Sequence, residues 1–329
     1  MFTYRHMDYP SGMRDPNLFR ASLAPIIAPT LAILISFGQT PSSMPAIALK
    51  IDHASVCGSA LEPMQRAFAS IGLPTDYGGP HANGVTHMAL LGFADGSYLE
   101  LIAPMKTMDH AAGMMSGWDK LMAGNAGPCA WAIGSDDIHS EVARLKRLGI
   151  KTSGPEPGGR KKPDGTQLSW EIASVGAGAP GATLPFMIED KTARNLRVQP
   201  SASLQDSGLT GIAIVILGVK DLDASIALFR KAYGWPAPEI ADQKDFAARI
   251  AYFPGTPVML AAPLGNSSWL AERLDKFGES PVAYLLGTTD IASATTKFQL
   301  RNSSTWFGRR MSWFDQAKLL GMRIGIIER

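Results

Sequence analysis

The chain has 329 residues, which is enough for two domains of about 150 residues that each bury a core. Hydrophobic residues make up 46% and charged residues 18%, a composition that excludes a disordered or fibrous protein. The net charge is +2, and no run of Lys or Arg is long enough to follow a phosphate backbone, so nucleic acid is excluded as a partner.

The chain has two cysteines, Cys57 and Cys129, and this number limits the disulfide and metal sites that it can form. Two cysteines are too few for a disulfide framework or for a zinc site built on thiolates. Both lie in apolar stretches with the pattern of strands, so we expect buried free thiols, and a single disulfide remains open as the alternative.

The amino-terminal segment, residues 1–46, differs from the rest of the chain and is expected to stay outside the fold. Basic residues precede ASLAPIIAPTLAILISFG (residues 21–38), an apolar run that two prolines interrupt. A stable membrane span takes about 20 apolar residues, so this run does not predict one. The basic flank and short apolar centre resemble a secretory signal, which would make the protein periplasmic or secreted. A start near Met44 would instead give a cytoplasmic protein.

From residue 47 onward, the chain alternates between the patterns of strands and helices. Residues 46–56 predict a strand, and residues 59–73 predict a helix whose apolar side chains recur on one stripe. Residues 86–104 predict a hairpin, because two β-rich runs meet at Asp95-Gly96, a pair that suits the positive backbone angles of a tight turn.

A second set of elements begins at residue 127. Residues 127–150 predict a strand followed by a helix, which Asp136 or Asp137 would cap. Two further strands are predicted at residues 166–175 and 184–190.

The carboxyl-terminal part of the chain repeats this order of elements. Residues 210–235 predict a strand and a helix, and residues 248–264 predict a hairpin. Residues 280–298 predict another strand and helix, and residues 321–328 close the chain with a strand.

Together these patterns predict an α+β protein of four βαβββ units that pair into two domains, residues 47–192 and 208–329. Residues 193–207 between them are polar and lack periodicity, as expected of a linker. Neighbouring units would close a sheet that neither unit could bury alone, with the helices on the outside.

Several separated motifs, in the same order, resemble the vicinal oxygen chelate superfamily, which includes glyoxalases and extradiol dioxygenases. The resemblance in the first domain is to the glyoxalase-like domain group, through IDHASV, GGPHANGVTHMALLGFADGSYLELIAP, SDDIHSEVARLKRLGI, GGRKKPDGTQLSWEIA and LPFMIED. It covers essentially all of residues 47–192 and, more faintly, residues 208–329. It implies half-barrel sheets whose concave face holds a divalent metal ion.

The resemblance also implies metal ligands on the first and last strands of each unit. These places match His53 and Glu100 in the first unit and Glu189 in the second. The remaining place is taken by Ala130 or Trp131, neither of which can ligate. One imidazole and two carboxylates suit Fe, Mn or Zn with open positions for a substrate. The metal would act as a Lewis acid that polarises substrate oxygens or stabilises an enolate, with Glu100 as the catalytic residue.

Strand alternation gives a separate expectation for the predicted hairpin. If Asp95-Gly96 is a two-residue turn, Leu91 lies opposite Glu100, and His87 shares that face of the sheet. His87 lies four residues further along, roughly 13 Å away at 3.4 Å per residue. We therefore expect His87 to bind substrate at the rim of the site and not to share a metal with Glu100.

Other predicted substrate-binding residues come from the same motifs. His81 lies in the Gly-rich loop YGGPHANG, from which it could fold over the cavity. Trp131 and Trp170 are expected in the core or in the cavity wall. Arg160 lies in the basic cluster GRKKPDG, which predicts a loop, and it resembles a recurrent loop position of the group. The planar guanidinium of arginine matches the geometry of a carboxylate, which favours a binding role. The alternative is a basic loop that is simply exposed to solvent, which is the usual role of such a cluster.

Each candidate also has a purely structural interpretation. A histidine in a strand is commonly a hydrogen-bonded structural residue, which is the alternative for His53. Glu100 must face a cavity or be paired, because an unpaired buried carboxylate is costly. Glu189 is followed by two charged residues, so a solvated strand end is its alternative. Asp52 is expected on the face opposite His53, at the surface or supporting the histidine.

The second domain departs further from the pattern. Aligning VMLAAP with YLELIAP places Met259 where Glu100 stands, and no histidine follows His139. Glu328, in the closing strand, is the only residue of this domain that corresponds to a ligand position of the pattern. We expect this domain to complete the first one structurally, to form the interface of a homodimer, or to hold an apolar ligand. Ordinary core packing is preferred over an apolar pocket for its aromatic cluster of Trp306, Phe307, Trp313 and Phe314.

Two functions are compatible with these residues. Domain one is either a metal-dependent isomerase, lyase or ring-cleaving dioxygenase of a small oxygenated molecule, or a metal-free protein that binds or sequesters a small molecule. Binding of a small-molecule ligand is common to both and is the primary prediction, since a fold does not fix a function by itself.

Overall fold

The computed structural model describes residues 45–105, 117–162 and 164–329. The signal-like segment predicted at residues 1–46 therefore lies, up to residue 44, outside the described residues. Within the described ranges, no helix combines the length and the hydrophobicity that crossing a membrane requires.

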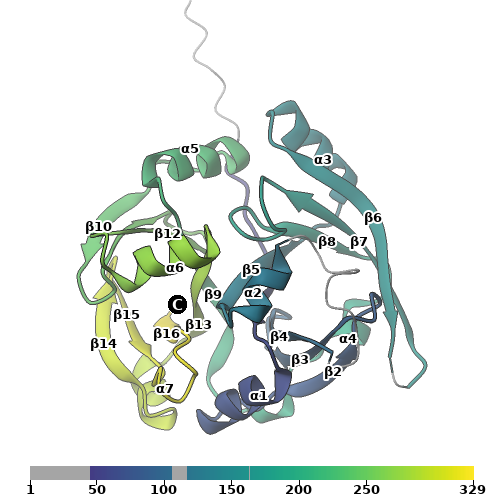
Figure 1. Cartoon of the computed structure of the whole chain (residues 1–329), viewed down its shortest axis with the longest axis horizontal. Helices are drawn as coiled ribbons and strands as arrows, with labels where there is room; N and C mark the ends of the chain where they lie inside the picture. The colour runs from purple at the N-terminus through teal and green to yellow at the C-terminus, as the bar shows by residue number, and fades with distance from the viewer. Residues whose placement is uncertain (1–44, 106–116, 163) are drawn as a thin grey trace, which may run out of the picture. The chain divides into compact units, whose positions relative to one another are not determined.

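The chain contains two modules, each of which is an eight-stranded sheet with its own helices (Figure 1). The elements of the first module are β1 (Ile51–Cys57), α1 (Leu61–Ser70), β2 (Asp76–Pro80), β3 (Thr86–Gly92), β4 (Tyr98–Pro104), α2 (Trp118–Ala123), β5 (Gly127–Gly134), α3 (Ile138–Arg147), β6 (Thr152–Lys161), β7 (Gln167–Val175) and β8 (Phe186–Asp190). The strand order is β2-β3-β4-β1-β5-β8-β7-β6. β1 pairs in parallel with β4 and antiparallel with β5, so the two βαβββ units join at the centre of the sheet.

The second module repeats the first after the short helix α4 (Arg194–Arg197) and a 3₁₀ helix (Ala202–Leu204). Its elements are β9 (Leu209–Gly218), α5 (Leu222–Tyr233), β10 (Glu239–Gln243), β11 (Ala248–Tyr252), β12 (Val258–Pro263), α6 (Trp269–Phe277), β13 (Ser280–Thr288), α7 (Ile291–Lys297), β14 (Arg301–Trp306), β15 (Arg309–Trp313) and β16 (Ile324–Glu328). The order β10-β11-β12-β9-β13-β16-β15-β14 matches that of the first sheet. The predicted α+β fold, duplicated from paired βαβββ units, is confirmed.

Local sequence explains where several elements begin. Asp137 caps α3, because its carboxylate accepts a hydrogen bond from the amide of Ser140 at 2.9 Å. The predicted apolar stripe of α1 is buried. The strand β2 is not predicted, because its sequence DYGGP has the composition of a turn. It forms because β3 lies beside it as a partner strand.

The turn between β3 and β4 has three residues and not the predicted two. The amide of Phe93 donates to the carbonyl oxygen of Ser97, and Gly96 between them adopts φ +84°. A three-residue loop with glycine in the left-handed region is a common hairpin turn. Its extra residue shifts the pairing by one, so Glu100 pairs with Leu90 and not with Leu91 as predicted.

Cys57 and Cys129 form a disulfide that joins β1 to β5. The expectation of buried free thiols is therefore wrong, and the alternative of a single disulfide holds. Opposite Ser55 and Val56, the pairing skips a residue in β5, which leaves Cys129 as the extra residue of a β-bulge. Bulges are set by tertiary pairing, so the sequence pattern of β5 does not reveal this one.

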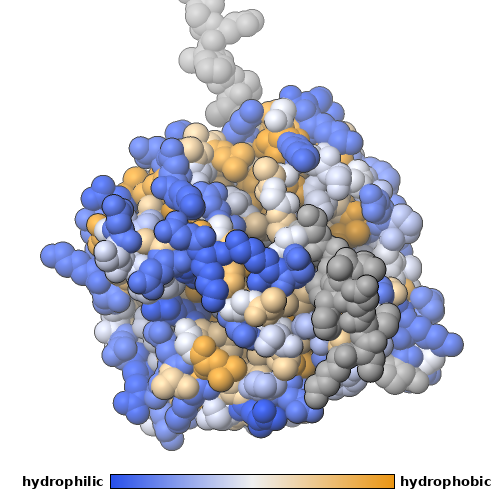
Figure 2. All heavy atoms as spheres, viewed as in Figure 1, coloured by the Kyte–Doolittle hydropathy of each residue, from blue (hydrophilic) through white to orange (hydrophobic). Residues whose placement is uncertain are grey.

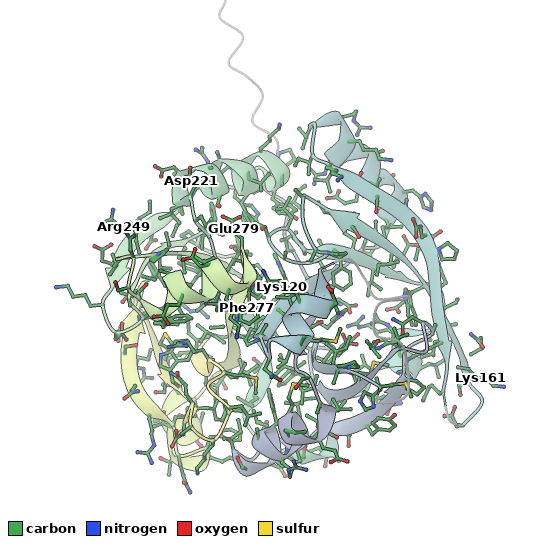
Figure 3. The ribbon with its side chains drawn as sticks, in the orientation of Figure 1. Lys120, Lys161, Asp221, Arg249, Phe277 and Glu279 are labelled. Carbon is green, nitrogen blue, oxygen red and sulfur yellow. A yellow bond between two sulfur atoms is a disulfide. The ribbon has the colours of Figure 1, made fainter. Side chains whose placement is uncertain are left out.

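The two modules share one hydrophobic core. Side chains from the central strands of both sheets belong to the same buried cluster, among them Ala54, Trp131, Val215 and Leu286. At the edge of the contact, Phe277 of α6 reaches the end of α2, where Figure 3 shows it near Lys120. A Cβ on Gly124 would lie 2.4 Å from the Phe277 ring, so this close approach requires glycine.

A buried tyrosine and a partly buried arginine of the second module bind the backbone of the first. The Tyr284 hydroxyl lies 2.7 Å from the carbonyl oxygen of Ser55 and 2.8 Å from that of Ala130, and it accepts from the amide of Cys129 at 3.2 Å. The Arg273 guanidinium of α6 donates to two more carbonyl oxygens near the start of β5. These groups lie beside the bulged pairing of β1 with β5, so the second module satisfies backbone groups there that would otherwise be buried unpaired.

One face of the second sheet is filled by a packed apolar cluster. Met259 stands at the place that corresponds to Glu100, as the alignment of the two motifs predicts. Phe246 contacts Trp306 and Trp313 with ring centroids 5.2 and 5.5 Å apart. Core packing, which the sequence favours over an apolar pocket, is confirmed for these two tryptophans.

Hydrophilic residues cover most of the face shown in Figure 2, with apolar residues in separate patches. On this face, the described residues form no extended apolar patch of the kind that marks an association site.

Candidate functional site

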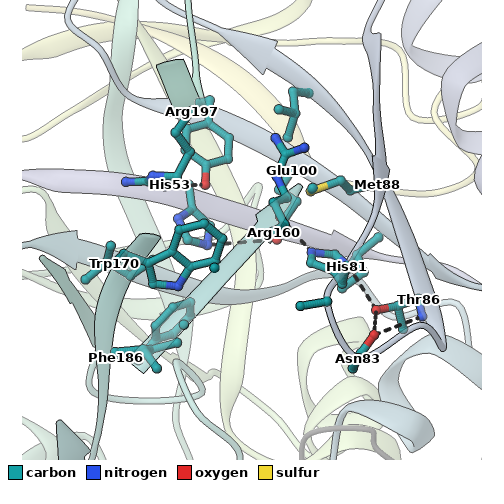
Figure 4. Close-up of a pocket in the computed structure, with 18 of the residues that line it drawn as sticks. His53, His81, Asn83, Thr86, Met88, Glu100, Arg160, Trp170, Phe186 and Arg197 are labelled. Atoms are coloured by element: carbon teal, nitrogen blue, oxygen red, sulfur yellow. Dashed lines mark hydrogen bonds and ion pairs between the residues drawn. The ribbon is translucent and has the colours of Figure 1, made fainter. Parts of the chain in front are cut away.

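A cavity of about 240 Å³ lies in the first module (Figure 4). This is below the roughly 300–1,000 Å³ usual for drug-sized ligands, so the cavity suits a small molecule. Its main polar lining residues are His53, His81, Thr86, Glu100, Arg160 and Arg197. Apolar side chains make up much of the rest, among them Met88, Leu90, Ile102, Trp118, Trp170 and Phe186.

His53 is held by its neighbour Asp52. Its Nδ1 lies 2.6 Å from Oδ1 of Asp52, and because a carboxylate only accepts, Nδ1 carries the proton. In the neutral ring the lone pair is then on Nε2, which lies 3.9 Å from Oε2 of Glu100. The ring stacks on Tyr98 with centroids 4.8 Å apart. Asp52 is buried and not on the opposite face, because a bulge in β1 interrupts the alternation at this residue.

Two arginines of α4 neutralise Asp52. Arg194 and Arg197 both contact its carboxylate, and Nη2 of Arg197 donates at 2.7 Å. Both also pair with Asp190 at the end of β8. Burial raises the pKa of Asp52, but the hydrogen bond from His53 and the charge of Arg197 outweigh it and hold the pKa well below its usual value. Asp52 therefore remains an anion that orients His53.

Glu100 lies between the two imidazoles and is only 6% exposed. Oγ of Ser55 donates to Oε2 at 3.2 Å, and Nε2 of His81 lies 3.3 Å from Oε1. Burial raises the pKa of Glu100, but the hydrogen bond from His81, the charges of His53 and His81, and the bond from Ser55 together lower it to about 2. The carboxylate is therefore ionised at neutral pH.

His81, just after β2, folds toward the cavity and meets Glu100. Because the ionised Glu100 can only accept, Nε2 of His81 carries a proton. Its Nδ1 lies 2.9 Å from Oγ1 of Thr86, and this hydroxyl lies 3.3 Å from Oδ1 of Asn83. The hydroxyl either donates to Nδ1 of a neutral ring or accepts from a doubly protonated one while it donates to Asn83.

Arg160 lies at the end of β6, on a strand and not in the predicted loop. Its Nη1 donates to the carbonyl oxygen of Gly78 at 2.7 Å. The neighbouring Trp170 of β7 also lines the cavity, and a Cβ on Gly158 would lie 2.4 Å from its Nε1. Glycine is therefore needed where β6 passes the indole. Lys161, which follows Arg160 at the end of β6, is exposed to solvent (Figure 3).

The structure brings together most of the predicted site residues in one cavity, namely His53, His81, Glu100, Arg160 and Trp170. Glu189, predicted as the third metal ligand, is not among them. Its Oε2 accepts from the amide of Ile138 at 2.8 Å, and Lys191 pairs with Oε1, so it serves the start of α3. Within the described residues, no three His, Cys, Asp or Glu side chains are arranged to hold a metal ion.

Trp131 and His87 also lie outside the cavity. Trp131 is fully buried in the shared core, and its Nε1 donates to the carbonyl oxygen of Thr183 at 3.1 Å. His87 is turned to the other face of β3 by the one-residue shift of the hairpin, and Met88 takes the cavity position.

Some residues of the site are not identified by the sequence. The linker that contains Arg194 and Arg197 predicts no contact with the first strand. Its only signal is a pair of arginines three residues apart, near the acid Asp190. Trp118 and Met122 of α2 line the cavity as well, and their four-residue spacing is a helical signal too short to predict.

A sequence model of the family described as glyoxalase-like domain matches residues 51–233. No curated protein sequence matches the chain. A hypothetical protein from Staphylococcus aureus is 13% identical, with a TM-score of 0.55, and the match covers 85% of this chain and 100% of that one. A mutant of 4-hydroxymandelate synthase from Streptomyces coelicolor is 12% identical, with a TM-score of 0.56 and coverage of 86% and 93%.

At these identities, the two solved structures show a shared fold alone. The family match is stronger, because it spans more than half of the chain and includes β1, β4 and the cavity residues of the first module. The chain belongs to the glyoxalase-like domain family, within the vicinal oxygen chelate superfamily.

Proposed function

We propose that the cavity of the first module is the active site of an enzyme for a small oxygenated molecule, in which His53 and Glu100 hold a divalent metal ion. The observation that carries this proposal is the hydrogen bond from His53 Nδ1 to Asp52, which directs the Nε2 lone pair toward Glu100. Histidines that ligate metals almost always donate their other ring N–H to a carboxylate, a carbonyl or water.

The donor chemistry and spacing of these two residues suit such an ion. The 3.9 Å between His53 Nε2 and Glu100 Oε2 is compatible with two ligands at about 2.0–2.2 Å from one ion. An imidazole and a carboxylate are acceptable to Fe, Mn or Zn. When bound, the ion would supply Lewis-acid polarisation of a substrate oxygen.

The residues themselves can also hold and move a proton. Glu100, with a pKa of about 2, is a weak base and stays anionic. In the absence of a metal ion, His53 Nε2 has an available lone pair, and Asp52 would stabilise the imidazolium that forms when it accepts a proton; a metal ion on Nε2 would occupy that lone pair.

Metal analysis of protein purified without chelator tests this proposal. We expect about one Fe, Mn or Zn ion per chain in the wild type and loss of that ion in His53→Ala and Glu100→Gln. His139→Ala is the matched control, because His139 is an exposed histidine on α3 outside the cavity. Metal that persists in both cavity variants would show that the ion binds elsewhere.

A metal-free binding protein is the second candidate function. The lack of a three-donor cluster among the described residues favours it. Wild-type protein from metal-rich growth that contains no stoichiometric metal, yet still binds a small molecule in the cavity, would establish this alternative.

We also propose that the protein is exported to the periplasm or the medium. The disulfide supports this, because disulfides persist in oxidising compartments and are rare in the cytosol. A reporter that is active only after export, fused behind residues 1–46, should be active. Inactivity of that fusion would favour a cytoplasmic protein that starts near Met44.

A further inference from the structure

We infer that the ligand of this cavity is a monocarboxylic acid with a small apolar body, and that Arg160 binds its carboxylate. The inference names the substrate class of the proposed active site and rests on that proposal, since both require a small molecule in the cavity. It does not require a metal.

Arg160 is a buried cation without an anionic partner in the described part of the chain. The residue is 7% exposed, and within the described residues its guanidinium makes one hydrogen bond, from Nη1 to the carbonyl oxygen of Gly78. A guanidinium has five N–H donors in a planar fork that matches a carboxylate. Burial lowers the pKa of Arg160, as expected of a desolvated cation. A buried charge is costly unless it is paired, so the free donors favour an anionic ligand in the cavity.

The other arginines at the site are already neutralised. Arg197 lines the cavity, but its guanidinium binds Asp52 and Asp190 at 2.7–2.9 Å. Arg194 pairs with the same two carboxylates. Among these three arginines, Arg160 is therefore the one that forms no ion pair with a carboxylate of the described residues.

A single negative charge fits this cavity better than a double one. The Glu100 carboxylate accepts from Ser55 and lines the same cavity, and it would repel a dianion more strongly than a monoanion. The Tyr98 hydroxyl, also on the lining, accepts from Arg197 Nη1 at 2.9 Å, which leaves its own hydrogen available for donation. It provides a neutral donor for the second oxygen of a carboxylate.

The rest of the lining determines the body of the ligand. The apolar walls come from β3, β4, α2, β7 and β8, and they include the indoles of Trp118 and Trp170 and the ring of Phe186. Such walls favour an apolar group, which gains free energy from leaving water. The volume of about 240 Å³ restricts this group to a short chain or a single ring.

Isothermal titration calorimetry of the full chain with phenylacetate and phenylacetamide tests the inference. The two probes share a body and differ in charge. We expect the carboxylate to bind at least about tenfold more tightly than the amide, because hydrogen bonds between charged groups are stronger than neutral ones. Phenyl phosphate, a dianion at neutral pH, should bind more weakly than phenylacetate. In Arg160→Gln the preference for the carboxylate should disappear, while the affinity for the amide changes by less than about threefold.

Two variants control for charge and folding. Lys161→Gln removes a neighbouring exposed cation and should keep the full preference. Arg160→Lys keeps the charge without the planar fork and should give an intermediate preference. Equal affinity of the two probes for the wild type, a preference that survives in Arg160→Gln, or failure of phenylacetate and butanoate to bind at millimolar concentration would overturn the inference.

Metal content separates this inference from the proposed function. Arg160→Gln should retain the metal of the wild type. If the wild type has no metal but still prefers the carboxylate, the metal-dependent enzyme fails and the inference stands. If metal is present and the preference for the carboxylate is absent, the inference fails and the proposed metal-dependent enzyme stands.

Discussion

Asp52 and Glu100 illustrate how neighbouring charges set the chemistry of single residues in this site. Both carboxylates are buried, and burial alone would raise their pKa. Each pKa is instead lowered by neighbouring groups. His53 and Arg197 lower the pKa of Asp52, and His81, His53 and Ser55 lower that of Glu100. The two anions thus fix the proton on Nδ1 of His53 and on Nε2 of His81.

The lowered pKa of Glu100 predicts a pH dependence of stability. A carboxyl whose folded pKa lies below its unfolded value stabilises the protein above the unfolded pKa and loses that contribution as the pH falls through the folded one. For Glu100, the window runs from about 4.5 down to about 2. Relative to Glu100→Gln, the wild type should lose about 3 kcal/mol of unfolding free energy across it, by urea denaturation. Glu62→Gln, on the surface of α1, should show no such change; a pH-independent difference would contradict the assignment.

Asp52→Asn tests the buried ion network. The substitution leaves Arg197 with one carboxylate and removes the anion that orients His53. Breaking a buried pair costs about 3–5 kcal/mol, which equilibrium unfolding would measure. Asp221→Asn is the control, since asparagine caps a helix about as well as aspartate and the change should stay within about 0.5 kcal/mol. Similar losses in both variants would mean that the network contributes little.

Pairing between elements decides which of these residues meet. The three-residue turn of the β3–β4 hairpin and the bulges of β1 and β5 each shift side chains by one position. These shifts bring Met88 into the cavity instead of His87, turn Asp52 toward His53, and leave Cys129 as the extra residue beside Cys57.

The link between β1 and β5 predicts a measurable contribution from the disulfide. It closes a loop with a sequence separation of 72 residues. Replacing both Cys57 and Cys129 by alanine should lower the unfolding free energy by about 2–4 kcal/mol. Thiol titration of the unfolded wild type should detect no free thiol before reduction. Two reactive thiols without reductant would show that the cysteines are unpaired.

At the scale of the whole molecule, the second module supports the first. It has apolar residues where the first has its site, and it provides Tyr284 and Arg273 to backbone groups beside the cavity strands. Ser55, whose carbonyl oxygen Tyr284 binds, also donates its hydroxyl to Glu100. Degeneration of one site is therefore compatible with retention of the module.

Tyr284→Phe tests this support. The variant removes one hydroxyl and leaves a buried amide and two carbonyl groups without that partner, which should cost about 1–3 kcal/mol of unfolding free energy. Tyr252→Phe in the same module is the control, because within the described residues its hydroxyl accepts two long hydrogen bonds, at 3.4 and 3.5 Å. An equal loss in the two variants would argue against a special role for Tyr284.

Local patterns in the sequence are sufficient to predict the four βαβββ units, because apolar periodicity and caps such as Asp137 act within one element. The motifs that contain His53, Glu100 and Arg160 likewise identify three residues that line the cavity. The sequence by itself misplaces His87 and Glu189, and for Trp131 it leaves core and cavity wall open.

Only the tertiary structure decides those positions, since they depend on turn length, bulges and strand pairing across the sheet. The contacts of Asp52 with α4 and of Ser55 with Tyr284 join residues separated by 142 and 229 positions. No local periodicity encodes such contacts. They form because buried charges and backbone groups must find partners once the strands have packed.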